Sequence, residues 1–206
     1  MTDPVSAVIW DVGGIVYRTP FEVFDRLEVE RGIEPGTLPR GPFGPGDPDY
    51  DAVDDGRIAE PEYWNAMRRR LLDRGVDVDV HRDISWPGLE RPEVLEVMQA
   101  LTGRVRQAVL TNDATAFLGI GWQQTWSCRS FVETVLDSVE LGVRKPHPDA
   151  YLAAAAAIGE PLQQCLFVDD LTVNVVAARA VGMRAVRFDV TDAGHGARAV
   201  LAAVDG

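Results

Sequence analysis

Residues 5–14 of the chain read VSAVIWDVGG. The apolar run over residues 5–10 is typical of a buried β-strand, and it ends in a carboxylate, Asp11. Gly13 and Gly14 follow closely, and two glycines allow the backbone to approach a ligand. Taken alone, this pattern leaves Asp11 as a structural turn residue, a nucleophile or a metal ligand.

Further apolar runs along the chain predict a sheet of parallel strands. Strand patterns cover residues 105–110, 164–168 and 184–188, and helical patterns cover residues 92–101 and 173–181. Strands that alternate with helices are typical of the α/β class with a doubly wound parallel sheet. Ligands of such sheets bind beyond the carboxyl ends of the strands, so we expect the chemistry directly after these runs.

A long segment after the first strand interrupts this alternation. Helical patterns cover residues 20–31 and 61–74, and residues 34–50 between them are crowded with glycine and proline. We interpret the segment as a small, mostly helical cap, in which residues 34–50 either line the active site or span the cap surface. The predicted division is residues 17–86 for the cap and residues 1–16 and 87–206 for the core.

The composition is that of a globular protein with a strong negative charge. The chain has 206 residues, of which 46% are hydrophobic, and a formal net charge of −12. A surface this acidic repels nucleic acid and anionic lipid, so we expect neither as a partner. The sequence has no apolar stretch near the ~18 residues of a membrane span, and its start lacks the basic region of a signal peptide. Cys128 and Cys165 form no CxxC motif, which favours a reduced, cytoplasmic setting.

Two further segments carry groups that suit a phosphate. Thr111 and Asn112 follow a predicted strand, and their hydroxyl, amide and backbone N–H groups suit phosphate oxygens, although either residue would also serve as a helix N-cap. Lys145 precedes Pro146 at the expected start of a helix. An ammonium group held at that position can neutralise a phosphate, whereas a lysine judged by itself is usually a surface residue.

Two adjacent carboxylates, Asp169 and Asp170, follow the strand pattern over residues 164–168. Carboxylates this close repel each other, and a hard divalent cation is the usual compensation. Acidic residues also suit the N-terminus of the helix expected after them. The pair therefore predicts either a metal site or an acidic helix start.

The order of these four segments resembles the haloacid dehalogenase (HAD) superfamily. The matching text is VIWDVGGIV, VLTND, SVELGVRKPHPDAY and FVDDLTVNVVAARAVGM, beginning at Val8, Val109, Ser138 and Phe167. The resemblance covers residues 5–17 and 93–188, and the helical insert is similar to the small cap of subfamily I. On these motifs the chain is identified as a member of the superfamily with a HAD, Rossmann-like core and a first motif of the form DxGG.

The resemblance implies a Mg²⁺-dependent phosphatase that acts on a phosphorylated small molecule, as a monomer or homodimer. Asp11 would attack phosphorus, and water would then hydrolyse the aspartyl-phosphate. Thr111 and Asn112 would hold phosphoryl oxygens, and Lys145 would neutralise charge and orient the nucleophile. The implied Mg²⁺ ligands are Asp11, the carbonyl group of Gly13 and Asp170, with Asp169 and Asn174 supporting them from behind.

Gly13 departs from the family pattern, because most phosphatases of this family carry there a second aspartate that acts as general acid and then base. Such catalysis is typically worth ~10²–10⁴-fold in rate.

The glycine leaves three alternative functions. One is a phosphatase whose leaving group needs little protonation or whose cap supplies the acid. A second is a protein that has lost the activity and binds ligands or serves another biosynthetic reaction. A third is a metal-free dehalogenase, against which the Asp169–Asp170 pair argues. The cap acids considered are Asp47, Asp49, Asp51, Asp54, Asp55 and His81.

Overall fold

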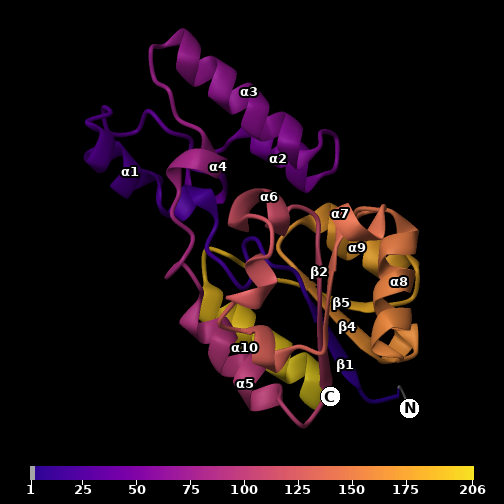
Figure 1. Cartoon of the computed structure of the whole chain (residues 1–206). Coiled ribbons are helices and arrows are strands. Elements are labelled where there is room, and N and C mark those ends of the chain that lie inside the picture. Colours follow the sequence, from indigo (N-terminus) through magenta and orange to yellow (C-terminus); the bar gives the residue numbers. More distant parts are fainter. Residues whose placement is uncertain (1–2) are drawn as a thin grey trace.

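The computed structural model describes residues 3–206, which form a five-stranded parallel sheet flanked by helices (Figure 1). The strands are β1 (Ala7–Trp10), β2 (Arg106–Thr111), β3 (Thr134–Asp137), β4 (Cys165–Asp169) and β5 (Arg184–Arg187). Their order across the sheet is β3-β2-β1-β4-β5. The strand that ends at Asp11 is therefore central, between β2 and β4. The predicted α/β class with a doubly wound sheet is confirmed.

Helices cover both faces of this sheet (Figure 1). One face carries α5 (Pro92–Leu101) and α10 (Ala193–Asp205), and the other carries α8 (Pro148–Ile158) and α9 (Thr172–Ala180). Side chains alternate along β1, so Val8 and Trp10 pack on the α5 side and Ile9 packs on the α8 side. Because both faces are buried, β1 is an unbroken apolar run, which is the pattern that predicted it.

The edge strand β3 was not predicted. It has only four residues, of which Thr134, Val135 and Leu136 are half-buried. Buried apolar runs were the signal for β1, β2 and β4, and β3 lacks such a run. The strand β5 is equally short and partly exposed but was predicted. The β-branched pair Thr134-Val135 was the available sign of this strand.

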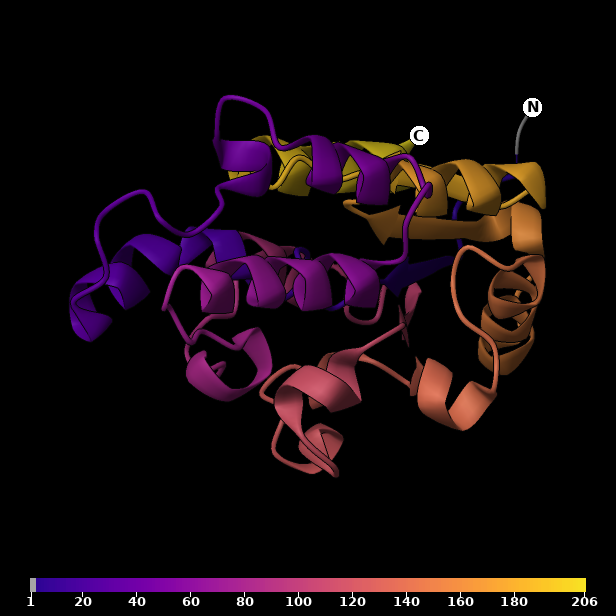
Figure 2. The same cartoon turned by 90° about the horizontal axis from the view of Figure 1, so that it is seen from above.

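Residues 17–86 form helices on the side of the sheet where the strands end (Figures 1 and 2). Their elements are η1 (Pro20–Glu22), α1 (Phe24–Arg31), η2 (Gly41–Phe43), α2 (Pro48–Asp54), α3 (Glu60–Asp73) and α4 (Val80–Asp83). The helix predicted over residues 20–31 is divided at Val23, and α2 forms where only a loop was expected. Asp47 starts α2 because its carboxylate accepts from the backbone N–H groups of Asp49 and Tyr50. The domain bounds themselves stay a prediction.

Shorter elements connect the rest of the core. They are α6 (Ala114–Leu118), η3 (Trp122–Gln124), η4 (Arg129–Phe131), α7 (Ser138–Leu141) and η5 (Leu162–Gln164). Across residues 3–206, no helix combines the length and apolar character that crossing a bilayer requires.

A buried ion pair ties the loop after β1 to the first turn of the helical insert. The Arg91 guanidinium donates to both carboxylate oxygens of Glu22 and, at 3.0 Å, to the carbonyl oxygen of Gly14. Glu22 also accepts from the backbone N–H of Thr19 at 2.8 Å. Arg91 thus fixes where the chain leaves the core, and removing one partner of such a buried pair is strongly destabilising.

Candidate active site

One pocket lies between the carboxyl edge of the sheet and the helices of residues 17–86. Its wall includes the predicted site residues Asp11, Gly13, Thr111, Asn112, Lys145, Asp170 and Asn174. Asp169 is fully buried directly behind this wall. Strand register explains the convergence, because Trp10 pairs with Val109 on one side and Val168 on the other. The three neighbouring strands therefore end at one level, although Trp10 and Val109 are 99 positions apart in the chain and Val109 and Val168 are 59 apart.

Lys145 lies at the centre of the polar network. Its Nζ is 2.8 Å from Oδ1 of Asp11 and 2.7 Å from Oδ2 of Asp169. Burial by itself lowers the pKa of Lys145, but the two carboxylates outweigh burial and raise that pKa above its ordinary value. The ammonium group is therefore charged at neutral pH.

The side chain of Asn112 holds the backbone of Lys145. Its Nδ2 donates to the carbonyl oxygen of Lys145, and its Oδ1 accepts from the backbone N–H of Lys145, both at 2.9 Å. Ser138 in turn donates to the carbonyl oxygen of Asn112 at 2.5 Å. This clamp was not predicted from the sequence, which assigned Asn112 to phosphate oxygens or to a helix N-cap. Both roles are compatible, since the clamp uses the side chain and leaves the backbone N–H group.

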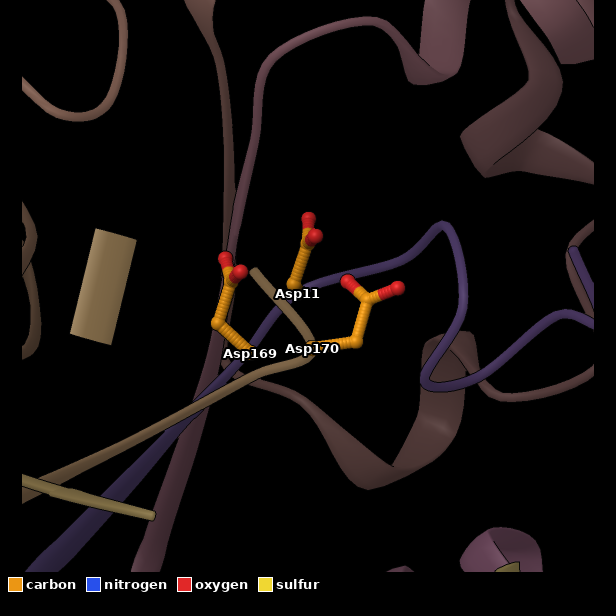
Figure 3. A group of neighbouring side chains, drawn as sticks. All are labelled: Asp11, Asp169 and Asp170. Carbon is orange, nitrogen blue, oxygen red and sulfur yellow. The ribbon is translucent and has the colours of Figure 1, made fainter. Parts of the chain in front are cut away.

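Three carboxylates form an acidic cluster at the floor of the pocket. Oxygens of Asp11, Asp169 and Asp170 lie within 4.8 Å of one another, and Figure 3 shows the side chains turned to a common side. Asp169 is saturated, because it accepts from Lys145 at 2.7 Å, from the backbone N–H of Leu171 at 2.9 Å and from Asn174 Nδ2 at 3.0 Å. Its contacts therefore suit a supporting role behind the site.

Asp170 is the least compensated acid of the cluster. Within residues 3–206 its carboxylate receives no hydrogen bond, and burial together with Asp169 and Asp11 raises its pKa well above the ordinary value. Burial also raises the pKa of Asp11 to about 7, although Lys145 opposes the shift. Burial and mutual repulsion make the charged forms of these two carboxylates unfavourable, and a hard divalent cation such as Mg²⁺, bound to their oxygens, is the usual compensation. The residues present therefore fit that ion.

The two glycines after Asp11 stand in different surroundings. Gly14 has φ +74°, and a Cβ there would lie 2.3 Å from Oδ2 of Asp170. A Cβ on Gly13 would meet no atom within 4 Å. Gly14 therefore makes room for the Asp170 carboxylate, whereas the space beside Gly13 is open to a side chain.

Gly14→Ala is expected to weaken binding of a divalent cation by ~10-fold or more, because the new methyl group displaces the Asp170 carboxylate. Isothermal titration calorimetry with Mg²⁺ measures this loss. Gly75→Ala is the matched control: Gly75 has φ +78°, and its Cβ would have no neighbour within 4 Å. Equal losses in both variants would mean that backbone strain, and not the position of Asp170, sets the effect.

The pocket wall also contains residues that sequence reasoning missed. Glu60 and Arg18 supply charge, and the aromatic residues of the wall are Tyr17, Phe21, Tyr50, Tyr63, Trp64, Trp86 and Phe117. The predicted helix began at Pro61, so Glu60 was read as preceding it instead of as the first residue of α3. A glutamate four residues before a tryptophan at a helix start was the available signal. Of the segment 34–50, Tyr50 reaches the wall.

The cap acids proposed from the sequence lie elsewhere among the described residues. Asp47, Asp49, Asp51, Asp54, Asp55 and His81 are all outside the pocket wall. Asp47 caps α2 and accepts from the Tyr63 hydroxyl at 2.7 Å, and Asp49 pairs with Arg70. Asp54 accepts from the backbone N–H of Thr172 at 2.7 Å. Asp47, Asp49 and Asp54 therefore make structural contacts within the protein.

Comparison with known proteins gives a consistent result. The sequence matches the family described as haloacid dehalogenase-like hydrolase over residues 5–182. A phosphatase of Mycobacterium tuberculosis is 38% identical over 85 residues, which are 41% of this chain and 39% of the relative. Hexitol phosphatase B of Escherichia coli is 30% identical over 144 residues, which are 68% of this chain and 64% of the relative. The matches thus span less than two thirds of either relative.

Among solved structures, the fold is similar to that of L-2-haloacid dehalogenase from Xanthobacter autotrophicus. The TM-score is 0.58 at 18% identity, over 89% of this chain and 77% of the other. At this level of identity the likeness concerns the fold alone.

Proposed function

The chain belongs to the haloacid dehalogenase-like hydrolases, and from that premise we propose that it is a Mg²⁺-dependent phosphatase of a phosphorylated small molecule. The observation that carries the proposal is the position of Lys145 between Asp11 and Asp169, with the uncompensated Asp170 on the same pocket floor. Such a floor binds an anion and a cation together. Relatives named as phosphatases, including phosphoglycolate phosphatase of Xanthomonas campestris, support a phosphate ester as substrate.

In the proposed reaction, a carboxylate oxygen of Asp11 attacks phosphorus and forms an aspartyl-phosphate, which water then hydrolyses. Lys145 donates to Oδ1 of Asp11 and orients that carboxylate for attack. The Thr111 hydroxyl and the backbone N–H of Asn112 bind the phosphoryl oxygens, where donors held in place stabilise the developing charge. The aromatic side chains of the wall offer an apolar surface to the leaving group.

The residues that would hold Mg²⁺ are Asp11, the carbonyl group of Gly13 and Asp170, with Asp169 and Asn174 behind them. When bound, the ion supplies positive charge that neutralises the phosphoryl group. Three expectations from the sequence remain predictions. They are a cytoplasmic location, a monomer or homodimer, and neither nucleic acid nor membrane as a partner.

Hydrolysis of 4-nitrophenyl phosphate with and without Mg²⁺ tests the proposal. Chelation with EDTA is expected to lower turnover by ~10²-fold or more, because a bound metal contributes several kcal/mol of charge stabilisation, and added Mg²⁺ is expected to restore it. Turnover that persists in EDTA would contradict the metal requirement. Phosphate binding without turnover on a panel of esters would favour a binding module. Metal-free halide release from a 2-haloacid would favour a dehalogenase.

A further inference from the structure

Glu60 is a carboxylic acid in the pocket wall that the reaction outlined above does not use. We propose that Glu60, carried by α3, is the general acid and then the general base of this site, in place of the carboxylate that Gly13 lacks. This role rests on the proposed phosphatase function.

The position of Glu60 is set by local structure. It is the first residue of α3, and its Oε1 accepts from the indole Nε1–H of Trp64, one turn later, at 3.1 Å. Trp64 is itself held by packing, with its ring centroid 5.2 Å from that of Phe21 and 4.8 Å from that of Tyr63. Among residues 3–206, no group donates to Oε2, so the second oxygen is available to a substrate. The carboxyl group is therefore held in place through Oε1, while Oε2 has no hydrogen-bond donor among the described residues.

The surroundings of Glu60 suit proton transfer near neutral pH. Burial raises the pKa of Glu60 to about 7, and Asp113 adds to the rise, while the Trp64 hydrogen bond and Lys145 oppose it. Both forms of the carboxyl group are then populated near pH 7, which is the condition under which one group both donates and accepts. The titratable and charged groups that act on Glu60 or feel its charge are Asp113, Lys145, Asp169, Asp170 and Tyr50.

Other proton donors of the wall are less suitable. Both carboxylate oxygens of Asp113 accept from Nη2 of Arg144, at 2.9 and 3.0 Å, so that carboxylate is tied to a cation. The Tyr63 hydroxyl already donates to Asp47. Burial, together with the charges of Asp170 and Glu60, raises the pKa of Tyr50, which makes its phenol a poor acid. Apart from Asp11 and Asp170, which are assigned to the nucleophile and the metal site, Glu60 is thus the wall carboxylate best suited to give a proton at neutral pH.

The proposed step balances over two half-reactions. In the first, the bond from an Asp11 oxygen to phosphorus forms, the bond to the leaving oxygen breaks, and the proton of Glu60 passes to that oxygen. The leaving group departs as an alcohol. In the second, the Glu60 carboxylate takes a proton from water as the water oxygen bonds to phosphorus and the bond to Asp11 breaks. Phosphate leaves, and protonated Glu60 and the free Asp11 carboxylate are restored.

The test compares two esters of similar shape, phenyl phosphate and 4-nitrophenyl phosphate. Nitrophenolate is a good leaving group and needs little protonation, whereas phenolate needs the acid. In Glu60→Gln, kcat/KM for phenyl phosphate is expected to fall by ~10²-fold or more, and that for 4-nitrophenyl phosphate by less than about tenfold. Glu62→Gln, the same change on an exposed residue two positions along α3 and outside the pocket wall, is the matched control.

A pH profile of the unmodified protein gives a second readout that does not depend on a variant. Glu60 must carry a proton to donate it, so kcat/KM for phenyl phosphate is expected to fall as the pH rises above about 7. This falling limb is expected to disappear in Glu60→Gln. Adding Gly13→Asp to Glu60→Gln is expected to raise kcat/KM for phenyl phosphate at least tenfold above that of Glu60→Gln alone, because the new side chain enters open space and carries a carboxyl group.

Three outcomes would overturn this role. If Glu60→Gln lowers kcat/KM equally for the two esters, Glu60 supports the structure of the pocket and does not transfer the proton. Unchanged phenyl phosphate hydrolysis in that variant, or a profile without the limb near pH 7, would show that the proton comes from elsewhere. If the unmodified protein with Mg²⁺ hydrolyses neither ester, the proposed phosphatase function is wrong, and the proposed role of Glu60 is wrong as well. The assay of the unmodified protein therefore distinguishes failure of the function from failure of the Glu60 role.

Discussion

Asp11→Asn is expected to lower turnover of a phosphate ester by at least ~10⁴-fold, a loss typical of removing a residue that acts as part of a covalent catalytic unit. An amide oxygen carries no full charge and is a poor nucleophile toward phosphorus. The substitution keeps the shape of the side chain, so Lys145 retains its 2.7 Å contact with Asp169 and the fold is preserved. Steady-state kinetics with Mg²⁺, together with acid quenching to trap phosphorylated protein, measures both the rate and the intermediate.

The matched control is Asp205→Asn, at the exposed end of α10, where the carboxylate pairs only with Arg104. It is expected to keep normal turnover and to trap the same amount of phosphorylated protein. Trapped phosphate that survives in Asp11→Asn would place the nucleophile on another residue. Turnover within tenfold of normal in that variant would rule out covalent catalysis by Asp11.

Lys145→Met is expected to destabilise the fold by about 3–5 kcal/mol and to abolish turnover. The reason is that Asp11 and Asp169, which the ammonium group now bridges, would be left as buried carboxylates without a cation. Lys145 is the only lysine of the chain, so no neighbouring lysine can take its place. Urea unfolding followed by circular dichroism measures the stability change.

Arg104→Met provides the comparison for stability, because it breaks an ion pair at the surface, where both side chains are about half exposed. Exposed pairs are worth under about 1 kcal/mol, so its unfolding free energy is expected to stay close to that of the unmodified protein. A loss in Lys145→Met no larger than in Arg104→Met would mean that the buried network contributes nothing beyond a surface contact.

Local sequence patterns were sufficient for the central sheet and for the position of the polar residues that follow its strands. Four of the five strands were predicted within two residues, and for the central strands β1, β2 and β4 the reason is that buried parallel strands are largely continuous apolar runs. The sites after β1, β2 and β4 then had to meet, since parallel neighbours end at one edge. Asp11, Thr111 and Asp170 could be placed in one pocket on that ground alone.

Tertiary structure alone decided the features that depend on neighbours distant in the chain. Glu60 is half-buried, accepts from Trp64 and feels the charge of Asp113, and its spacing to Trp64 is a weak local sign that does not reveal a place in the pocket wall. The Asn112 clamp on Lys145 likewise joins residues 33 positions apart. Strand and helix patterns are set by adjacent residues, whereas burial and charge depend on the whole fold. For that reason the groups proposed to bind phosphate could be identified from the sequence, and the group proposed to transfer the proton could not.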